Sequence, residues 1–269
     1  MAGFTRRDVL RYIGAAPVIA ACSSKSDISV DGQPVDTSVM PDAPVVLRPW
    51  ATGGTVAMTD KASYPDPFTS PATGCMIIYS STAGPCTTAT DLARVDVSEG
   101  WTGLPVRLAL RFMTAACAPI AGAVVKIWHT NVAGSYSGVT PNPTMCLKDQ
   151  SYSTMDFFRG VQTTDAKGVV YFDTCFPGWY AGRAIHIHLQ ITNGATISRV
   201  SQLFFPETLT SDIFANHSEY APYGQPDTAF ANDGVMAAIT PSARQRSIVE
   251  WSQMTDGAML ASKTITVTL

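Results

Sequence analysis

Two of the four histidines in the sequence stand two residues apart, in the run His186-Ile187-His188. Side chains at positions i and i+2 of a β-strand lie on the same face, so a strand here would direct both imidazoles to one side. Two imidazoles directed together form half of a metal site, although a His-x-His pair alone is more often structural. For the other two histidines, we expect no ligand role for His129 and an exposed position for His217.

Two tyrosines occupy turns upstream of this histidine pair. The tight turn Pro177-Gly178 can bring Tyr180 back toward the histidines, a few residues further along the chain. Earlier in the sequence, a strand-like run ends in Gly134-Ser135-Tyr136. Turns of this kind can direct phenols toward the histidines, so the surroundings of the pair favour a chemical role for it.

The elements that must position these side chains read as short strands separated by glycine and proline turns. Apolar or alternating runs predict strands at 106–113, 123–128, 168–173, 185–191, 197–205 and 264–269. The dipeptide Asn193-Gly194 between two of them predicts a β-hairpin. Residues 206–250 are less regular, and we expect a short helix near 243–251. The pattern is typical of an all-β fold, a single β-sandwich of mostly antiparallel strands with long loops.

Composition supports a folded β domain and argues against some functions. The chain has 269 residues, of which 46% are hydrophobic and 14% charged, and its net charge is −3. The apolar fraction excludes a disordered chain, and the absence of a basic excess argues against nucleic acid as a partner. We expect one catalytic domain over residues 46–269.

The N-terminus is typical of an export signal. Arg6-Arg7 precedes a short apolar stretch that ends in Ala20-Ala21-Cys22. About ten apolar residues are too few to span a bilayer, and paired arginines indicate the twin-arginine route. We expect residues 1–21 to be a signal peptide and Cys22 to be lipidated. Residues 22–45 would then tether an exported, membrane-anchored lipoprotein, with the lipid as its only membrane contact.

Five cysteines remain once Cys22 is assigned to the anchor. They are Cys75, Cys86, Cys117, Cys146 and Cys175. An odd number cannot pair completely, so at most two disulfides form within one chain and one thiol is left over. Cys75 with Cys86 is a plausible local pair, but the sequence leaves the connectivity open.

Several runs resemble one enzyme family, the intradiol ring-cleavage dioxygenases. These non-haem iron(III) enzymes open catechols between the two hydroxyls. The resemblance lies in GAVVKIWHTNVAGSYS, FRGVQTTDAKGVVYFDTCFPGWYAGRAIHIHLQI and SQLFFPE, with LARVDVSEGWTGLPVRLAL and Gly84-Pro85-Cys86 upstream. It extends from about residue 84 to 206, and more loosely to 234.

The resemblance implies four iron ligands, namely Tyr136, Tyr180, His186 and His188. In the family's arrangement Tyr180 and His188 are axial, and Tyr180 is the ligand that leaves when substrate binds. Zinc or copper on the same histidines is a weaker alternative, because two tyrosines suit neither metal well.

The resemblance also implies residues around the substrate. Arg183 matches the arginine beside the bound ring, and Gln202 matches a pocket glutamine with a catalytic role. Gly84 and Pro85 match a segment that lines the substrate cavity. The interval from Tyr180 to Arg183 is shorter than in the catechol and protocatechuate enzymes. It is more similar to an exported, compact branch of the family, in which a more open cleft would accept larger or more hydroxylated rings.

These residue types suit iron(III) and a catechol. Ferric iron prefers anionic oxygen, and a bound phenol loses its proton far below its usual pKa of about 10. Two phenolates and a hydroxide cancel the metal charge, and a catechol can pass its two protons to the hydroxide and to Tyr180. We therefore expect an Fe(III) dioxygenase that inserts both atoms of O2 into a catechol-type ring and yields a muconate-type dicarboxylate. The alternative is a non-catalytic β-sandwich lipoprotein of the same descent that binds aromatic or carbohydrate ligands.

Overall fold

The computed structural model of the protein describes residues 49–89 and 92–268. The predicted signal peptide, the lipidated Cys22 and the tether at 22–45 lie outside these residues and stay predictions. Among the described residues, no helix has both the length and the apolar character needed to cross a membrane.

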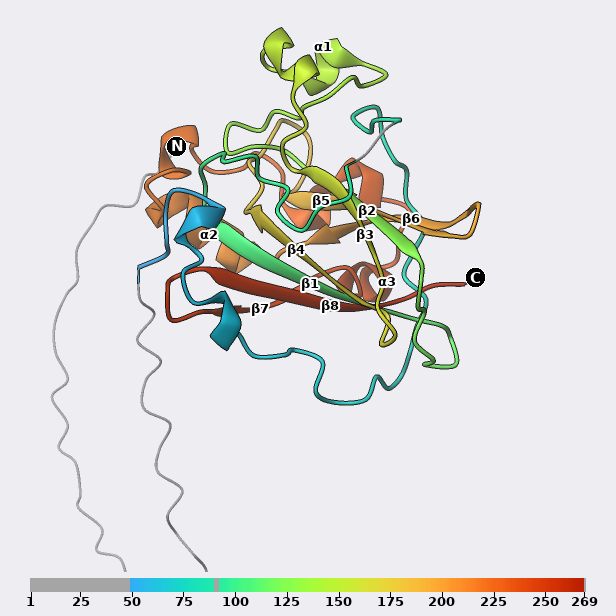
Figure 1. Ribbon diagram of the computed structural model, residues 1–269. Coiled ribbons are helices and arrows are strands. Elements are labelled where there is room, and N and C mark those ends of the chain that lie inside the picture. The colour runs from blue at the N-terminus through green and yellow to red at the C-terminus, as the bar shows by residue number, and fades with distance from the viewer. Residues whose placement is uncertain (1–48, 90–91, 269) are drawn as a thin grey trace, which may run out of the picture. The chain divides into compact units, whose positions relative to one another are not determined.

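Two four-stranded sheets make up the framework (Figure 1). Sheet A has the order β4-β1-β8-β7, formed by Val169–Cys175, Pro105–Met113, Met259–Thr266 and Glu250–Gln253. Sheet B has the order β3-β2-β5-β6, formed by Arg159–Thr163, Val124–Trp128, His186–Asn193 and Thr196–Phe204. All neighbours are antiparallel except β1 and β8, which run parallel. The predicted β-sandwich is confirmed.

The core lies between the sheets and takes alternate residues from β1, β2, β4, β5 and β8. In β5, Ile187, Leu189 and Ile191 are buried in this core together with Leu108 and Leu110 of β1. Because side chains alternate along a strand, the intervening residues of β5 must point to the other face. The two histidines of the His-x-His pair therefore lie on the outer face of sheet B, away from the core.

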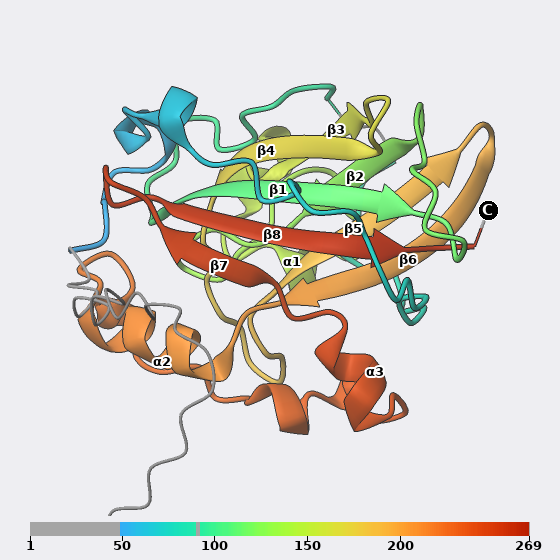
Figure 2. The same ribbon diagram turned by 90° about the horizontal axis from the view of Figure 1, so that it is seen from below.

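The helices are short and lie outside the sheets. They are α1 (Pro143–Cys146), α2 (Glu207–Asn216) and α3 (Pro241–Gln245). Short 3-10 helices occur at Thr55–Ala57, Lys61–Ser63, Gln150–Thr154, Ala221–Tyr223, Phe230–Asn232 and Gly234–Met236. The loop that carries α1 projects beyond the strands in Figure 1, and α2 and α3 lie on the β6–β7 side in Figure 2. These outer segments, rather than the core, supply the loops around the histidines.

The strand predictions hold for β1, β2, β4, β5 and β6, with ends shifted by one or two residues. The hairpin at Asn193-Gly194 joins β5 to β6, as predicted. The last strand, β8, ends at Thr266 and therefore lies earlier in the chain than the predicted range 264–269. The helix predicted at 243–251 is also wrong: α3 ends at Gln245, and residues 250–253 form β7, which pairs with β8.

Two disulfides connect segments that are distant in the sequence. Cys75 pairs with Cys117 and Cys86 pairs with Cys146, whereas Cys175 is a buried free thiol. The prediction of one unpaired cysteine is confirmed, and the suggested local pair of Cys75 with Cys86 is wrong. Between Cys75 and Cys86 the chain runs from β8, where Ile77 bridges Thr266, toward sheet B. The two thiols therefore lie apart and bond to different partners.

Candidate metal centre

Four side chains bring their polar ends together on the outer face of sheet B. The Tyr136 hydroxyl lies 3.3 Å from the Tyr180 hydroxyl and 3.4 Å from Nε2 of His186. The Tyr180 hydroxyl lies 3.3 Å from the same nitrogen. Nε2 of His186 lies 3.2 Å from Nε2 of His188. The four residues that the family resemblance implied as ligands thus form one cluster.

Strand register places one row of side chains across sheet B behind this cluster. Trp128 of β2 stands opposite Arg159 of β3 and opposite His188 of β5, and His188 stands opposite Gln202 of β6. Directly opposed residues share a face and contact one another. The Trp128 ring stacks on the His188 imidazole with centroids 4.7 Å apart and planes 8° apart, which fixes the orientation of that ring.

Tyr136 is held from both sides of its backbone. Its N–H donates to the Cys146 carbonyl at 2.9 Å. The next residue, Ser137, accepts hydrogen bonds from the buried Arg159 guanidinium, at its carbonyl and, over 3.1 Å, at its hydroxyl. The Tyr136 side chain is only 2% exposed, so its position is set by a rigid environment.

Glycines allow the two tyrosine loops to meet. Gly134 has φ +76°, and a Cβ there would overlap the Trp179 carbonyl, directly before Tyr180. Gly178 donates its N–H to the Asn131 carbonyl at 3.1 Å, and a Cβ there would overlap the same carbonyl. Any side chain at either glycine would push the loops apart. The Pro-Gly turn therefore brings Tyr180 toward the histidines, as predicted.

The electrostatics of the cluster follow from burial. Burial, together with the neighbouring Tyr180, raises the pKa of Tyr136, and burial also raises that of Tyr180. Burial lowers the pKa of His186 to about 3, and burial together with the neighbouring His186 lowers that of His188. Without a metal, the phenols are protonated and the imidazoles neutral, so no net charge is buried.

The donor set fits a hard trivalent cation. Nδ1 of His186 lies 2.6 Å from the Ala184 carbonyl, so it carries the proton and Nε2 presents its lone pair to the cluster. Donors bound to one ion at about 2.0–2.2 Å are separated by roughly 3 Å, close to the separations seen here. Among the described residues, no group of three or more His, Cys, Asp or Glu side chains could hold a metal. A metal held at this cluster would therefore need the two tyrosines as ligands.

A buried ion pair supports the arginine beside the cluster. Arg183 Nη1 lies 3.4 Å from the Tyr180 hydroxyl, and Nη2 donates to Gln202 Oε1 at 2.6 Å. Its Nε donates to both carboxylate oxygens of Asp233 at 3.0 and 3.1 Å. The same carboxylate accepts the Ala184 N–H at 3.0 Å. Asp233 was not predicted, because it is 50 residues from Arg183 and stands in an Asp-Gly pair that reads as a turn.

A cavity of about 460 Å³ opens in front of the cluster. It is lined by Thr82, Gly84, Pro85, Cys86, Gly134, Tyr136, Met145, Tyr180, Ala181, Arg183, His188, Gln202 and Val235. Every predicted site residue of the domain except His186 is among them, and His186 contacts the two tyrosines and His188. Gly84 lies against the His188 ring, because a Cβ on it would be 3.5 Å from Cε1.

The other two histidines lie apart from the cluster. His129 is fully buried, with Nε2 at 2.7 Å from the Thr174 hydroxyl and Nδ1 at 2.9 Å from the Thr130 carbonyl. Its ring nitrogens are both occupied, and burial lowers its pKa to about 4. The predicted exposure of His217 is wrong: it is 3% exposed, and Nε2 lies 2.9 Å from the Ala51 carbonyl. The residues around His217 are polar and therefore suggest an exposed loop. They do not indicate that this histidine forms a structural link at the end of α2.

Comparisons with known proteins bear on the family and the fold of the chain. Residues 78–264 match the family model described as "Dioxygenase". An intradiol ring-cleavage dioxygenase from Tetranychus urticae is 28% identical, with a TM-score of 0.63 over 72% of this chain and 95% of that chain.

Two further solved structures share the fold. The dioxygenase domain of a dioxygenase carbohydrate-binding protein fusion from Streptomyces sp. SirexAA-E is 19% identical, with a TM-score of 0.52 over 72% of this chain and 99% of that chain. A 3-chlorocatechol 1,2-dioxygenase from Rhodococcus opacus 1CP is 20% identical, with a TM-score of 0.50 over 70% and 72%. No curated protein sequence gives a significant match.

Proposed function

This chain belongs to the intradiol ring-cleavage dioxygenase family, and on that premise we propose that it is a non-haem Fe(III)-dependent dioxygenase. It inserts both atoms of O2 into a catechol-type ring and cleaves the ring between the hydroxyls to a muconate-type dicarboxylate. The convergence of two phenols and two imidazoles within 3.2–3.4 Å of one another supports this proposal most strongly.

Tyr136, Tyr180, His186 and His188 would hold the iron. When bound, ferric iron keeps the substrate oxygens deprotonated and makes the ring reactive toward O2. Tyr136 and Tyr180 as phenolates would cancel two of the three positive charges of the ion, and a doubly deprotonated catechol beside one phenolate would cancel all three. Binding of the substrate would therefore bury no uncompensated charge, provided that one tyrosine gives up its place.

A difference in burial between the two tyrosines supports Tyr180 as the one that gives up its place. Both line the cavity, but Tyr136 is 2% exposed, whereas Tyr180 is half-buried. Tyr180 can accept a proton from a substrate hydroxyl at its Oη and move aside. Arg183 Nη1, 3.4 Å from that oxygen, is placed to hold the released phenol.

Arg183 is also the electrostatic element of the site. Its guanidinium borders the cavity, and although its full charge is paired with Asp233, the N–H dipoles that face the cavity can stabilise negative charge that develops on the ring during attack by O2. Gln202 accepts from Nη2 and so fixes the plane of the guanidinium. Because these donors are already oriented, little reorganisation is needed when charge develops.

The alternative is a non-catalytic sandwich that binds aromatic or carbohydrate ligands. Such a binding module has no need to bury two phenols and two imidazoles with their polar ends together. Burying polar groups in a dry cluster costs free energy, so the arrangement favours a metal enzyme.

We further propose that the protein is exported by the twin-arginine route and anchored through lipidated Cys22. The two disulfides support this proposal, because they form and persist in oxidising compartments. Fractionation of cells that express Cys22→Ser tests it: the variant is expected in the soluble fraction, and one that stays in the membrane contradicts the anchor.

The central experiment loads the full chain with ferric iron and measures absorption, oxygen uptake and product. We expect a strong red to purple band from phenolate bound to iron, and oxygen uptake with catechol, protocatechuate or hydroxyquinol that yields the ring-opened dicarboxylate. The metal-free protein is the control. A fully metallated protein that is colourless, or a coloured protein that takes up no oxygen with any catechol, would contradict the proposal.

A further inference from the structure

We propose that the substrate of this site is a catechol whose ring substituents carry no charge, and that Asp233 sets this preference by neutralising Arg183. This inference rests on the proposed function and specifies its substrate class.

The described part of the cavity wall holds a single charged side chain. Among the described residues that line it, Arg183 is the only Lys, Arg, Asp or Glu. Pro85, Met145, Ala181 and Val235 give the cavity an apolar border. Lys148 is a cation close to Gly134, but it is exposed to solvent and its ammonium donates to the Ala133 carbonyl, so water screens it.

The charge of Arg183 is already compensated. Asp233 accepts Nε with both oxygens, and its side chain is 0% exposed. Its oxygens also accept the N–H groups of Ala184 and Val235 at 3.0 and 2.9 Å. These bonds fix the carboxylate in place beside the guanidinium, and the remaining nitrogens of Arg183 contact Gln202 and Tyr180.

A carboxylate on the substrate ring would therefore meet no free cation. It would bring a second negative charge near Arg183, whose positive charge is already paired with Asp233. An unpaired charge in a partly dry cavity is expensive to desolvate. An uncharged substituent meets only the apolar border and loses little hydration. The site should thus discriminate by the charge of the substituent rather than by its size.

Two substrates of nearly equal size isolate this effect. Protocatechuate and 3,4-dihydroxybenzamide differ in having a carboxylate or a neutral amide on the same ring. On the iron-loaded full chain, we expect the amide to bind at least about tenfold more tightly without oxygen and to show a similarly higher kcat/KM with oxygen. Equal or tighter binding of protocatechuate would overturn the inference, even if both rings are cleaved.

The variant Asp233→Asn tests the role of the carboxylate. It releases the charge of Arg183, so we expect protocatechuate to gain about tenfold relative to the amide in both measurements. Asp173→Asn is the matched control, because Asp173 is a 2% exposed carboxylate paired with Lys61 and Arg107 on the outer face of sheet A. It should leave the ratio unchanged.

The outcomes separate the two proposals. A merely structural role for Asp233 would lower the values for both substrates equally and keep their ratio, which would contradict its role in charge selection. If the iron-loaded protein neither binds nor cleaves either ring, the proposed function itself fails and the inference fails with it.

Discussion

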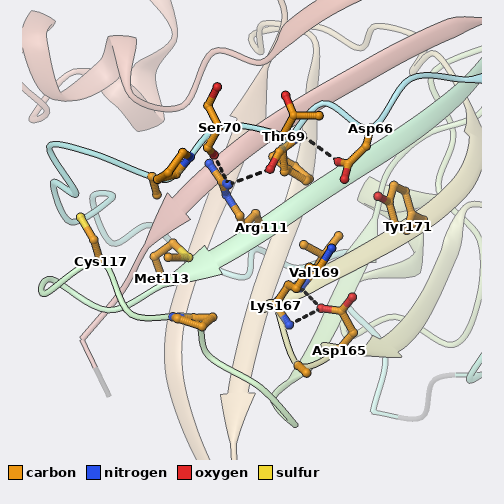
Figure 3. A pocket seen from close by; sticks show the side chains of 15 residues that line it. Asp66, Thr69, Ser70, Arg111, Met113, Cys117, Asp165, Lys167, Val169 and Tyr171 are labelled. Atoms are coloured by element: carbon orange, nitrogen blue, oxygen red, sulfur yellow. Dashed lines mark hydrogen bonds between the residues drawn. The ribbon is translucent and has the colours of Figure 1, made fainter.

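The two outer faces of the sandwich each carry a hollow, and the hollows differ in what their polar groups contact. The hollow on sheet A, of about 510 Å³, is the larger (Figure 3). There Arg111 donates to the Ser70 carbonyl at 2.9 Å, and Asp165 accepts the N–H groups of Lys167 and Val169 at 2.8 Å each. Asp165 therefore stabilises its own turn, and Arg111 holds the segment around Ser70 against the sheet.

On sheet B the polar groups contact one another instead. Tyr136, Tyr180, His186 and His188 come from three separate segments, and their polar ends meet at one point. Chemistry requires several groups that act on the same atom, whereas a turn requires only one acceptor for its own amides. The convergence of buried donors, and not the volume of the hollow, is the basis for the proposed active centre.

The largest expected difference in activity between the two faces comes from removing one phenol oxygen on each of them. Tyr136→Phe deletes a proposed iron ligand, and Tyr171→Phe deletes the hydroxyl of a tyrosine in the hollow on sheet A. Loss of groups that merely support a metal ligand commonly costs 10- to 100-fold, so we expect Tyr136→Phe to lose more than about 100-fold in activity. Tyr171→Phe should stay within about twofold.

Oxygen uptake, iron content and the visible band measure this difference. His188→Ala should reproduce the loss seen with Tyr136→Phe, because both would remove ligands of one ion. Full activity in both variants would refute the assignment of the cluster. A comparable loss in Tyr171→Phe would show that the two faces are not distinct in function.

Removal of the two disulfides should have an effect of intermediate size. It compares the same two faces, because each hollow is lined by one half-cystine. Cys86 lines the cavity on sheet B, and Cys117 lines the hollow on sheet A. The Cys86–Cys146 bridge packs with Trp128 and Tyr136. Replacing either pair by alanine should lower the free energy of unfolding by about 2–4 kcal/mol, since both bridges close long loops.

Only the pair at the cavity should also change catalysis. We expect Cys86→Ala with Cys146→Ala to raise KM about tenfold, because the segments beside Tyr136 lose their link. Cys75→Ala with Cys117→Ala should leave KM unchanged after a similar loss of stability. Thermal unfolding and steady-state kinetics on both double variants test this, and equal KM values would mean that the bridge near the cluster is purely structural.

The sequence predicts those parts of the site that depend on short spacing. His186 and His188 share a face because they are two residues apart on a strand, and the family motif supplies the two tyrosines. Strands β1 and β5 were predicted because their apolar residues recur at a fixed spacing. In contrast, Asp233 and the partner of Cys86 depend on contacts between distant segments, which no local pattern records.

Some of the elements that were not predicted have a recognisable pattern in the local sequence, and others have none. In α2, the buried residues Leu209, Ile213 and Phe214 recur at spacings typical of a helix, so this helix could have been predicted. β7 is a half-exposed edge strand with the sequence EWSQ, which has no apolar alternation. This segment forms a strand only because it pairs with β8. Tertiary pairing, rather than propensity, decides such segments.

The smallest expected effect comes from adding one methyl group near each disulfide. Gly84 and Gly74 have φ values of +69° and +62°, so alanine at either position is strained by about 1 kcal/mol. At Gly74 the new Cβ meets nothing within 4 Å, but at Gly84 it lies 3.5 Å from Cε1 of His188. Both variants should therefore unfold at similarly lower temperatures, and only Gly84→Ala should raise KM, by about two- to threefold, because its methyl group narrows the cavity beside the His188 ring. If Gly74→Ala changed KM as much, strain transmitted through the fold, and not contact with the cluster, would explain the effect.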